Sequence, residues 1–458
     1  MTEMEQLEEM CRAVPPPDPQ RLAGARARVL AAIAEGQGPA SRAARGWPWL
    51  ATRAPGRWRG LVAPLAAAAA VTAVVAGALA VAGVIHGAGV TPSASLAHQA
   101  IAYVTNQGSG TVTPIRAATN TAGKPVKVGR EPVTIAVTPD GETAYVVNNG
   151  PPGTVTPIRA ATDTALTPIK VGRSPVAIAI TPDGKTAYVA NYGSGTVTPI
   201  RAATNTALKP IRVGLHPTAI AITPDGKTAY VATEGSGILI GPPGSVTPVR
   251  TATNTALTRI KTGRDPLAIA ITPDGKTAYV ANYWSGTVTP VRTATNTALT
   301  PIKTGRDPVA IAITPDGKTA YVANTNNGSP GTVTPIRTAT NTALTPIKTG
   351  RDPVAIAITP DGKTAYVANN GSGTVTPIRT ATNTALTPIK VGRHPVAIAI
   401  TPDGKTAYVA NYGYPGSVTP IRTATNTALT PLKTGQAPGA IAITRSGRRA
   451  LRPGDRAR

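Results

Sequence analysis

The chain of 458 residues contains no phenylalanine, and aromatic residues of all kinds make up only 3% of it. A core without many large rings has to be filled by Val, Ile, Ala, Thr and Tyr, which favours flat β-sheets over a helical bundle. The single cysteine, Cys11, excludes a disulfide within the chain. The four histidines (His86, His98, His216 and His394) show no metal-ligand spacing. We therefore expect no metal site and no cofactor.

Acidic residues are also scarce. The chain has 21 Asp and Glu and 46 Lys and Arg, which gives a formal net charge of +25. Such a surface attracts polyanions, so anionic cell-wall or surface polymers are candidate partners, and another surface protein is the alternative. Excess charge that only aids solubility would look the same in the sequence. No aromatic residues are interleaved with the cations to form a stacking platform, which disfavours nucleic acid.

A unit of 42 to 49 residues recurs along most of the chain. Its "AYVAN" segment places a tyrosine at Tyr103, Tyr145, Tyr188, Tyr230, Tyr279, Tyr321, Tyr366 and Tyr408. A period in this range, with several short β-like runs per unit, is typical of a β-propeller.

One unit predicts one blade of four antiparallel strands. The apolar run Val176–Thr181 is the expected innermost strand, because a strand that is apolar on both faces is buried on both faces. Pro182–Lys185 (PDGK) is a tight turn, in which proline presets φ and glycine takes a positive φ. The second, third and fourth strands are expected at Thr186–Asn191, Thr196–Arg201 and Leu208–Val213.

Proline lies inside both the third and the fourth expected strands, as at Pro199 and Pro210. An outermost strand tolerates proline, and proline there discourages aggregation between sheet edges. An interior strand would lose a hydrogen-bond donor from its ladder. We therefore expect a bulge in the third strand, or a shortened third strand.

The ends of the repeat region set the number of blades. Seven complete units run from Pro132 to Ala437. Gln99–Glu131 supplies only the second, third and fourth strands of a unit, and Pro438–Thr444 supplies only a first strand. Together these fragments make one more blade, so the sequence predicts an eight-bladed ring that is closed by the terminal strand. A seven-bladed ring with one spare unit is the alternative.

The pattern resembles the YVTN-repeat family of bacterial and archaeal cell-surface propellers. "AYVTN" at Ala102–Asn106, the "TPDGKTAYVAN" runs and the "TATNTA" turns carry the resemblance over about three quarters of the chain. The wider group includes lactonase-like propellers. Family members often have an acidic residue after the third strand, where this chain has arginine, as at Arg201. The resemblance implies a propeller at the cell surface and leaves its ligand open.

The sequence predicts one membrane-spanning helix, because Leu61–Ile85 has 25 uncharged residues rich in Ala and Val. Arginines lie upstream of it and none follows until Arg116, so the positive-inside rule places the N-terminus in the cytoplasm and the propeller outside. The alternative is a secreted protein, cleaved near Ala97. The expected segments are a cytoplasmic tail, partly helical or disordered (1–60), the transmembrane helix (61–85), a linker (86–98), the propeller (99–444) and a basic C-terminal tail (445–458).

The expected ligand site is the end of the ring where the loops between blades meet the loops between the second and third strands. Arginines in the first kind of loop could hold a phosphate or a carboxylate; they are Arg130, Arg173, Arg264, Arg306, Arg351 and Arg393. Aromatic residues of the second kind of loop could add stacking and hydrogen bonds; they are Tyr192, Tyr283, Trp284 and Tyr412. Three of the arginines are followed directly by Asp, so local pairing that leaves an ordinary solvated surface is the alternative.

No Ser-His-Asp arrangement and no pair of carboxylates is visible, so no catalytic residue is predicted. If there is catalysis, the asymmetric features Gly235–Gly244 and Trp284 are where we expect it. The sequence thus predicts a membrane-anchored extracellular β-propeller that acts as a binding or scaffold module for anionic envelope polymers. A lactonase-like hydrolase, or a sensor that signals through the N-terminal tail, is the alternative.

Overall fold

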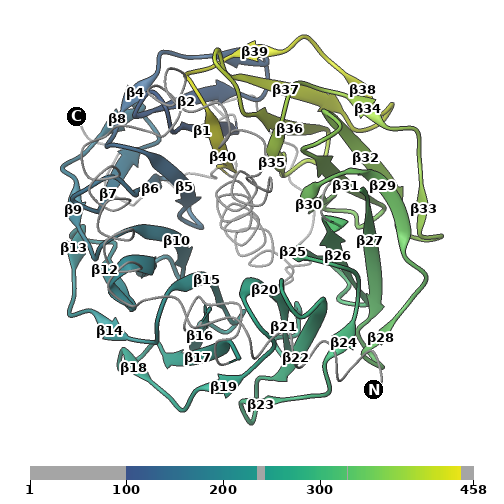
Figure 1. Cartoon of the computed structure of the whole chain (residues 1–458). Helices are drawn as coiled ribbons and strands as arrows, with labels where there is room; N and C mark the ends of the chain where they lie inside the picture. The colour runs from purple at the N-terminus through teal and green to yellow at the C-terminus, as the bar shows by residue number, and fades with distance from the viewer. Residues whose placement is uncertain (1–99, 235–242, 327–328, 445–458) are drawn as a thin grey trace, which may run out of the picture. The chain divides into compact units, whose positions relative to one another are not determined.

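The computed structural model describes residues 100–234, 243–326 and 329–444, and these form eight antiparallel sheets that follow one another around a ring (Figure 1). We number the sheets as blades 1 to 8 in the order of their second strands along the chain. Every blade has an innermost, a second and a third strand, and then two very short outer strands that both pair with the third. The predicted eight blades are confirmed, and the seven-bladed alternative is wrong.

From blade 1 to blade 8, the innermost strands are β40 (Pro438–Ile443), β5 (Pro132–Val137), β10 (Pro175–Ile180), β15 (Pro217–Ile222), β20 (Pro266–Ile271), β25 (Pro308–Ile313), β30 (Pro353–Ile358) and β35 (Pro395–Ile400). The second strands are β1 (Ile101–Asn106), β6 (Thr143–Asn148), β11 (Thr186–Asn191), β16 (Thr228–Thr233), β21 (Thr277–Asn282), β26 (Thr319–Asn324), β31 (Thr364–Asn369) and β36 (Thr406–Asn411). The third strands are β2 (Thr111–Arg116), β7 (Thr154–Arg159), β12 (Thr196–Arg201), β17 (Ser245–Arg250), β22 (Thr287–Arg292), β27 (Pro330–Arg337), β32 (Thr374–Arg379) and β37 (Ser417–Arg422).

The first short outer strands are β3 (Thr121–Ala122), β8 (Thr164–Ala165), β13 (Thr206–Ala207), β18 (Thr255–Ala256), β23 (Thr297–Ala298), β28 (Thr342–Ala343), β33 (Thr384–Ala385) and β38 (Thr427–Ala428). The second short outer strands are β4 (Val126–Lys127), β9 (Ile169–Lys170), β14 (Ile211–Arg212), β19 (Ile260–Lys261), β24 (Ile302–Lys303), β29 (Ile347–Arg351), β34 (Ile389–Lys390) and β39 (Leu432–Lys433). A short 3₁₀ helix, η2 (Tyr192–Ser194), follows β11.

The ring closes as the out-of-phase ends of the repeat region predict. β40, from the C-terminal end of the described chain, pairs antiparallel with β1, and Ala102 lies opposite Ile443. The amide of Ile101 donates to Oγ1 of Thr444 at 2.9 Å, across 343 residues of sequence. Ile441 in β40 is 1% exposed. Blade 1 is therefore assembled from both ends of the propeller.

Proline in the third strand does not disturb that strand. Pro199 lies opposite Tyr188 in a register between β11 and β12 that has no shift. The carbonyl of Pro199 accepts from the amide of Leu208 at 2.8 Å, on the outer side of β12. In an antiparallel strand the nitrogen and the carbonyl of one residue point to the same side, so the nitrogen of Pro199 also faces outward. The outer strand is interrupted there, at residues 208–210, between β13 and β14. The expected bulge or shortening of the third strand is wrong, and so is the expected continuous fourth strand Leu208–Val213.

The asparagine that ends most second strands ties the second strand to the third. Nδ2 of Asn191 donates to Oγ1 of Thr196 at 3.1 Å and to Oγ1 of Thr198 at 2.9 Å. Because side chains alternate along a strand, Thr196 and Thr198 point to the same face and can share one amide group. The recurring "N…TVT" spacing in the sequence is the result of this contact.

The repeated tyrosine joins each blade to the next. All eight of these tyrosines are at most 1% exposed, and each hydroxyl donates to Oδ1 of a residue in the "TATNTA" turn of the following blade, at 2.5 to 2.7 Å. The last of them, Tyr408 of blade 8, donates to Asn120 of blade 1. The acceptors have φ between 49° and 54°, a region that Asn and Asp tolerate better than other side chains. We call each pair a latch.

Removing one latch hydroxyl should cost stability. Burial, and then the charge of Asp361, raise the pKa of Tyr366 to about 12, so its hydroxyl keeps the proton that it donates to Asn426. We expect Tyr366→Phe to lower the free energy of unfolding by about 1–2 kcal/mol, the value of a buried hydrogen bond. Tyr414→Phe is the matched control, because Tyr414 is 65% exposed. Equal effects of the two changes in denaturant unfolding would contradict the role of the latch.

In the parts of the chain that the structure describes, no helix is long and apolar enough to cross a membrane. The predicted spanning helix (61–85), the N-terminal tail (1–60), the linker (86–98) and the basic C-terminal tail (445–458) all lie outside those parts. Most of the insert Gly235–Gly244 lies outside them as well.

Candidate functional sites at the collar and the rim

In every blade the innermost strand begins and the second strand ends at the same face of the ring, so two residues per blade meet there. The leading residue directly precedes the innermost strand; in blade order these residues are Ala437, Glu131, Ser174, His216, Asp265, Asp307, Asp352 and His394. The trailing residue directly follows the second strand; these residues are Gln107, Asn149, Tyr192, Glu234, Tyr283, Thr325, Asn370 and Tyr412. In each blade the trailing amide donates to the leading carbonyl at 2.8 to 3.2 Å. We call these sixteen residues the collar.

The collar concentrates differences between blades that are otherwise nearly identical. Its leading and trailing residues each include five residue types, whereas the turn at the opposite face reads Pro-Asp-Gly in all seven copies. All eight leading residues have φ between 50° and 57°, yet none is glycine, the residue that adopts this conformation without strain. Strained backbone of this kind clusters at functional sites, which makes the collar a candidate site.

On blades 3 to 5, side chains of the collar contact one another across blades. The rings of Tyr192 and His216 stack with their centroids 4.6 Å apart, and the Tyr192 hydroxyl donates to Oε2 of Glu234 at 3.0 Å. Burial, reinforced by the nearby charge of Asp265, raises the pKa of Glu234 to about 7, although the bond from Tyr192 acts in the other direction. Burial raises the pKa of Asp265 to about 6. Both carboxyl groups can therefore exchange protons near neutral pH.

The predicted aromatic site residues do come to this face. Tyr192, Tyr283 and Tyr412 are collar residues, and Trp284, which is 39% exposed, packs edge-on against Tyr283 with centroids 5.1 Å apart. The six predicted arginines are exposed and directly precede leading residues of the collar.

The collar also carries a set of carboxylates; they are Glu131, Glu234, Asp265, Asp307 and Asp352. Four of these five lie on consecutive blades, 4 to 7, and an anion bound there would meet their charge. The predicted anion site at the arginines therefore stays a prediction. Sequence reasoning missed Glu234, although the replacement of Asn-Tyr by Thr-Glu at residues 233–234 was a visible signal.

The two raised pKa values predict a specific dependence of stability on pH. A carboxyl group whose pKa is higher in the folded state contributes stability that is fully present below its unfolded pKa and is lost as the pH rises through its folded pKa. For Glu234 that window runs from 4.5 to about 7. Glutamine, like the protonated carboxyl group, is uncharged, and it stays so at every pH. We therefore expect Glu234→Gln to raise the free energy of unfolding at pH 8 by about 2 kcal/mol and to leave it unchanged at pH 4. Urea unfolding at both pH values measures this, and an equal effect at both would contradict it.

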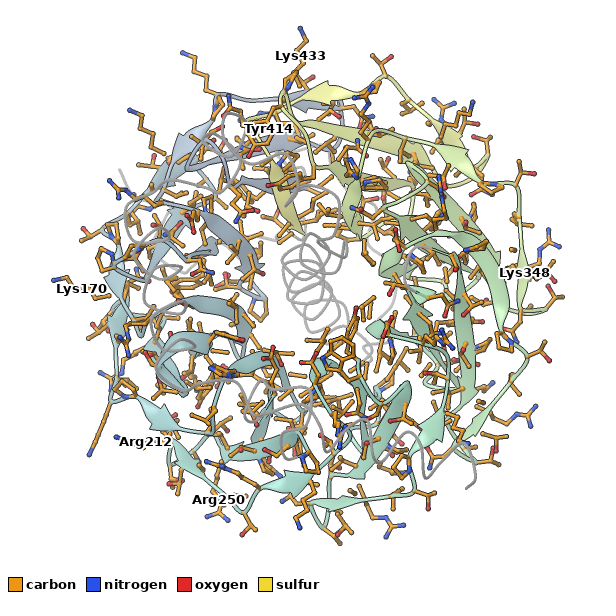
Figure 2. The ribbon with its side chains drawn as sticks, viewed as in Figure 1. Lys170, Arg212, Arg250, Lys348, Tyr414 and Lys433 are labelled. Carbon is orange, nitrogen blue, oxygen red and sulfur yellow. The ribbon has the colours of Figure 1, made fainter. Side chains whose placement is uncertain are left out.

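Basic residues gather on a second surface, the outer rim of the ring. Eight exposed arginines end the third strands; they are Arg116, Arg159, Arg201, Arg250, Arg292, Arg337, Arg379 and Arg422. Eight more exposed cations, one per blade, directly follow the first residue of the second short outer strands; they are Lys127, Lys170, Arg212, Lys261, Lys303, Lys348, Lys390 and Lys433. Figure 2 shows Lys170, Lys348 and Lys433 reaching outward from the rim. We call these sixteen residues the belt.

The belt faces almost no opposing charge. From the third strand to the last outer strand of each blade, the described sequence has one acidic residue, Asp163, and no aromatic residue. Asp163 lies 3.5 Å from Arg116. At the opposite face from the collar, by contrast, lysines pair with the turn aspartates, as Lys363 does with Asp361 at 3.9 Å. A hydrogen bond from the Thr359 hydroxyl lowers the pKa of Asp361, which keeps this partner charged.

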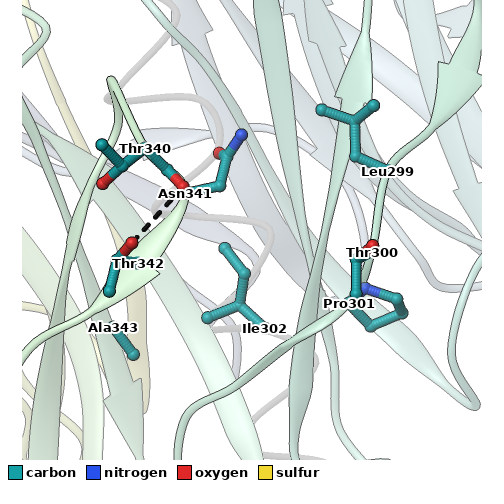
Figure 3. Close-up of a pocket in the computed structure, with 8 residues that line it drawn as sticks. All are labelled: Leu299, Thr300, Pro301, Ile302, Thr340, Asn341, Thr342 and Ala343. Carbon is teal, nitrogen blue, oxygen red and sulfur yellow. Dashed lines mark hydrogen bonds between the residues drawn. The ribbon is translucent and has the colours of Figure 1, made fainter.

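A groove crosses the rim between blades 5 and 6. It has a volume of about 430 Å³ and is lined by residues 299–302 of blade 5 and residues 340–343 of blade 6 (Figure 3). The side chains of Ile302 and Asn341 lie between the two segments. Nearly the same residues recur at the other junctions, so the rim repeats one shape.

The described residues contain no group of three or more His, Cys, Asp or Glu that could hold a metal ion.

Comparison with known proteins supports a β-propeller. A family described as "Lactonase, 7-bladed beta-propeller" matches residues 99–216 and 202–304, which is less than half of the chain. The present ring has eight blades, one more than that description. No curated protein matches the chain. The resemblance to YVTN-repeat proteins stays a prediction.

Solved structures share the fold. Hydrazine synthase of Kuenenia stuttgartiensis is 27% identical with a TM-score of 0.55, and the match covers 64% of this chain and 96% of that one. Dihydro-haem d1 dehydrogenase NirN in complex with DHE is 14% identical with a TM-score of 0.64, over 76% and 75% of the two chains. A functionally unknown protein from Desulfotomaculum acetoxidans is 18% identical with a TM-score of 0.52, over 75% and 99%. The last two show the fold alone.

Proposed function

We propose that this protein is a membrane-anchored, extracellular binding module that holds anionic polymers of the cell envelope on the belt. The observation that carries the proposal is the sixteen exposed cations around the rim, with Asp163 as the one acidic residue beside them in the described chain. Repeated cations give many weak contacts to one polymer, and linked contacts combine into strong binding. The anchor is the segment 61–85.

Phosphate, sulfate and carboxylate groups all suit such a surface. Arginine forms paired hydrogen bonds to these groups, and lysine adds a compact charge. The outer strands have no aromatic residue on which bases could stack, so the belt favours an anionic glycopolymer over a single-stranded nucleic acid.

The purified full-length chain tests this proposal directly. Binding to a sulfated glycan (heparin), to a polyglycerol phosphate and to polygalacturonate is compared with binding to neutral dextran. We expect binding to the anionic polymers alone, with an affinity that falls linearly with salt concentration on a logarithmic plot. Binding to dextran as tightly as to heparin, or no binding to any of the polymers, would refute the proposal.

A lactonase-like hydrolase is a second candidate, because the lactonase family match covers residues 99–304. That range contains His216 and Glu234, and a carboxyl with a pKa of about 7 suits general acid or base catalysis near neutral pH. Turnover of a lactone by the full-length chain that is lost in Glu234→Gln would favour this candidate over a binding module.

A further inference from the structure

The latches fix the direction of an amide group at each junction between blades. Oδ1 of Asn341 accepts from the Tyr279 hydroxyl at 2.6 Å, so the oxygen of this amide is held toward the blade interior. Within the described chain, no hydrogen bond uses Nδ2 of Asn341. Because Asn341 lines the groove of Figure 3, its two N–H donors remain for a molecule that occupies the groove.

The neighbours of Asn341 add positive charge and an apolar floor. Lys303 directly follows the buried Ile302 of the groove, and Arg337 lies opposite Thr342 in the register between β27 and β28. The Thr342 hydroxyl donates to the carbonyl of Thr340 at 3.4 Å, so its proton is already used (Figure 3). The positive charges and the N–H donors around the groove suit a ligand that carries negative charge and hydrogen-bond acceptors.

Seven of the eight junctions have this asparagine and one has an aspartate. The asparagines are Asn120, Asn205, Asn254, Asn296, Asn341, Asn383 and Asn426. At the junction of blades 1 and 2 the position is Asp163, which accepts from Tyr103 at 2.6 Å just as the asparagines accept from their tyrosines. A carboxylate offers no N–H donor, and Asp163 also lies 3.5 Å from the belt residue Arg116.

We propose that each asparagine groove binds one anionic group of a linear polymer, through the latch amide and the flanking belt cations, and that the Asp163 groove does not. The inference rests on the proposed function and adds the subsites that hold the polymer. Seven subsites around one rim require a polymer with regularly repeated phosphate, sulfate or carboxylate groups.

The Asp163 junction supplies the substitution for the test. Because Asp accepts the latch bond there, Asn→Asp keeps the latch while it removes two N–H donors and adds a negative charge. The test variant changes six grooves at once; its substitutions are Asn205→Asp, Asn254→Asp, Asn296→Asp, Asn341→Asp, Asn383→Asp and Asn426→Asp. The control variant makes the same change in net charge at the face opposite the collar; its substitutions are Lys185→Gln, Lys227→Gln, Lys276→Gln, Lys318→Gln, Lys363→Gln and Lys405→Gln.

Binding of full-length chains to heparin, polyglycerol phosphate and polygalacturonate is measured by calorimetry, and melting curves confirm that each variant is folded. We expect the six-groove variant to lose about 100-fold in affinity for at least one of these polymers and the control less than about 5-fold. The polymer that shows the largest difference identifies the anionic group. We expect Asp163→Asn to increase the affinity for the same polymer about 2-fold.

Equal losses in the two charge-matched variants would overturn the inference and leave the proposed function standing, since net charge alone would then explain binding. Binding of oligo-dT as tight as that of the best glycopolymer, with the same loss in the six-groove variant, would overturn the assignment of the subsites to a glycopolymer. If the unmodified chain binds none of the polymers, the proposed function itself fails.

Discussion

Removal of residues 438–458 is expected to lower the melting temperature of the full-length chain by roughly 10 °C or more, because it deletes the inner strand of blade 1. β40 buries Ala440 and Ile441, and it gives β1 its only inner neighbour in the described chain. Without it, the backbone groups along the inner edge of β1 lose their partners, and buried groups without partners are costly. The neighbouring blades 2 and 8 also lose contacts with this strand.

The control for this deletion is a chain that lacks only residues 445–458. It keeps β40 and Thr444, whose Oγ1 accepts from the Ile101 amide at 2.9 Å, so its melting temperature should be unchanged. Ile441→Asp should destabilise the ring through the same strand, since it buries a charge at a position that is 1% exposed. If the chain that lacks residues 438–458 gives the same melting curve as the unmodified chain, the ring does not depend on this closure.

Reversal of charge on the belt should abolish most polymer binding. The change is Lys170→Glu, Lys303→Glu, Lys348→Glu and Lys390→Glu, at exposed positions on four different blades. Each replacement removes an attractive contact and adds a repulsive one, so we expect the affinity for heparin to fall at least about 100-fold at physiological salt. The melting temperature should change little, because exposed surface charges contribute little to stability. Calorimetric titration measures the affinity.

The fold could be predicted from the sequence because local chemistry repeats in every unit. Short continuous apolar runs, as in Val176–Thr181, predicted the inner strands, and the turn at Pro182–Lys185 predicted the connection that follows them. The out-of-phase fragments at Gln99–Glu131 and Pro438–Thr444 gave the closure. All of these signals lie within a few residues of each other or at the ends of the repeat region.

Contacts between blades could not be predicted in the same way. The latch from Tyr279 to Asn341 joins residues 62 positions apart, and it depends on how neighbouring sheets pack. The interruption of the outer strand at residues 208–210 follows from the direction in which Pro199 faces, which the sequence does not reveal. Pattern reasoning placed proline correctly in the third strand and wrongly expected that strand to bend.

The candidate sites, too, could be predicted from local sequence but not where they depend on contacts between blades. The sequence identified the loops of the collar and the tyrosines at Tyr192, Tyr283 and Tyr412. It did not show that Glu234 and Asp265 come close enough for one charge to affect the other, because they belong to different blades. It listed the basic residues, but only the radial arrangement of the blades places sixteen of them around one rim.

The central claim is that the belt holds the polymer, and a comparison of two charge-reversed chains tests it most directly. The first carries the four belt reversals. The second carries the same number of reversals at the face opposite the collar, where each lysine pairs with a turn aspartate; its substitutions are Lys185→Glu, Lys227→Glu, Lys318→Glu and Lys363→Glu. In heparin titrations at physiological salt, the account predicts that the belt variant loses at least about 100-fold in affinity and the second variant less than about 10-fold. Equal losses, or a larger loss in the second variant, would contradict it.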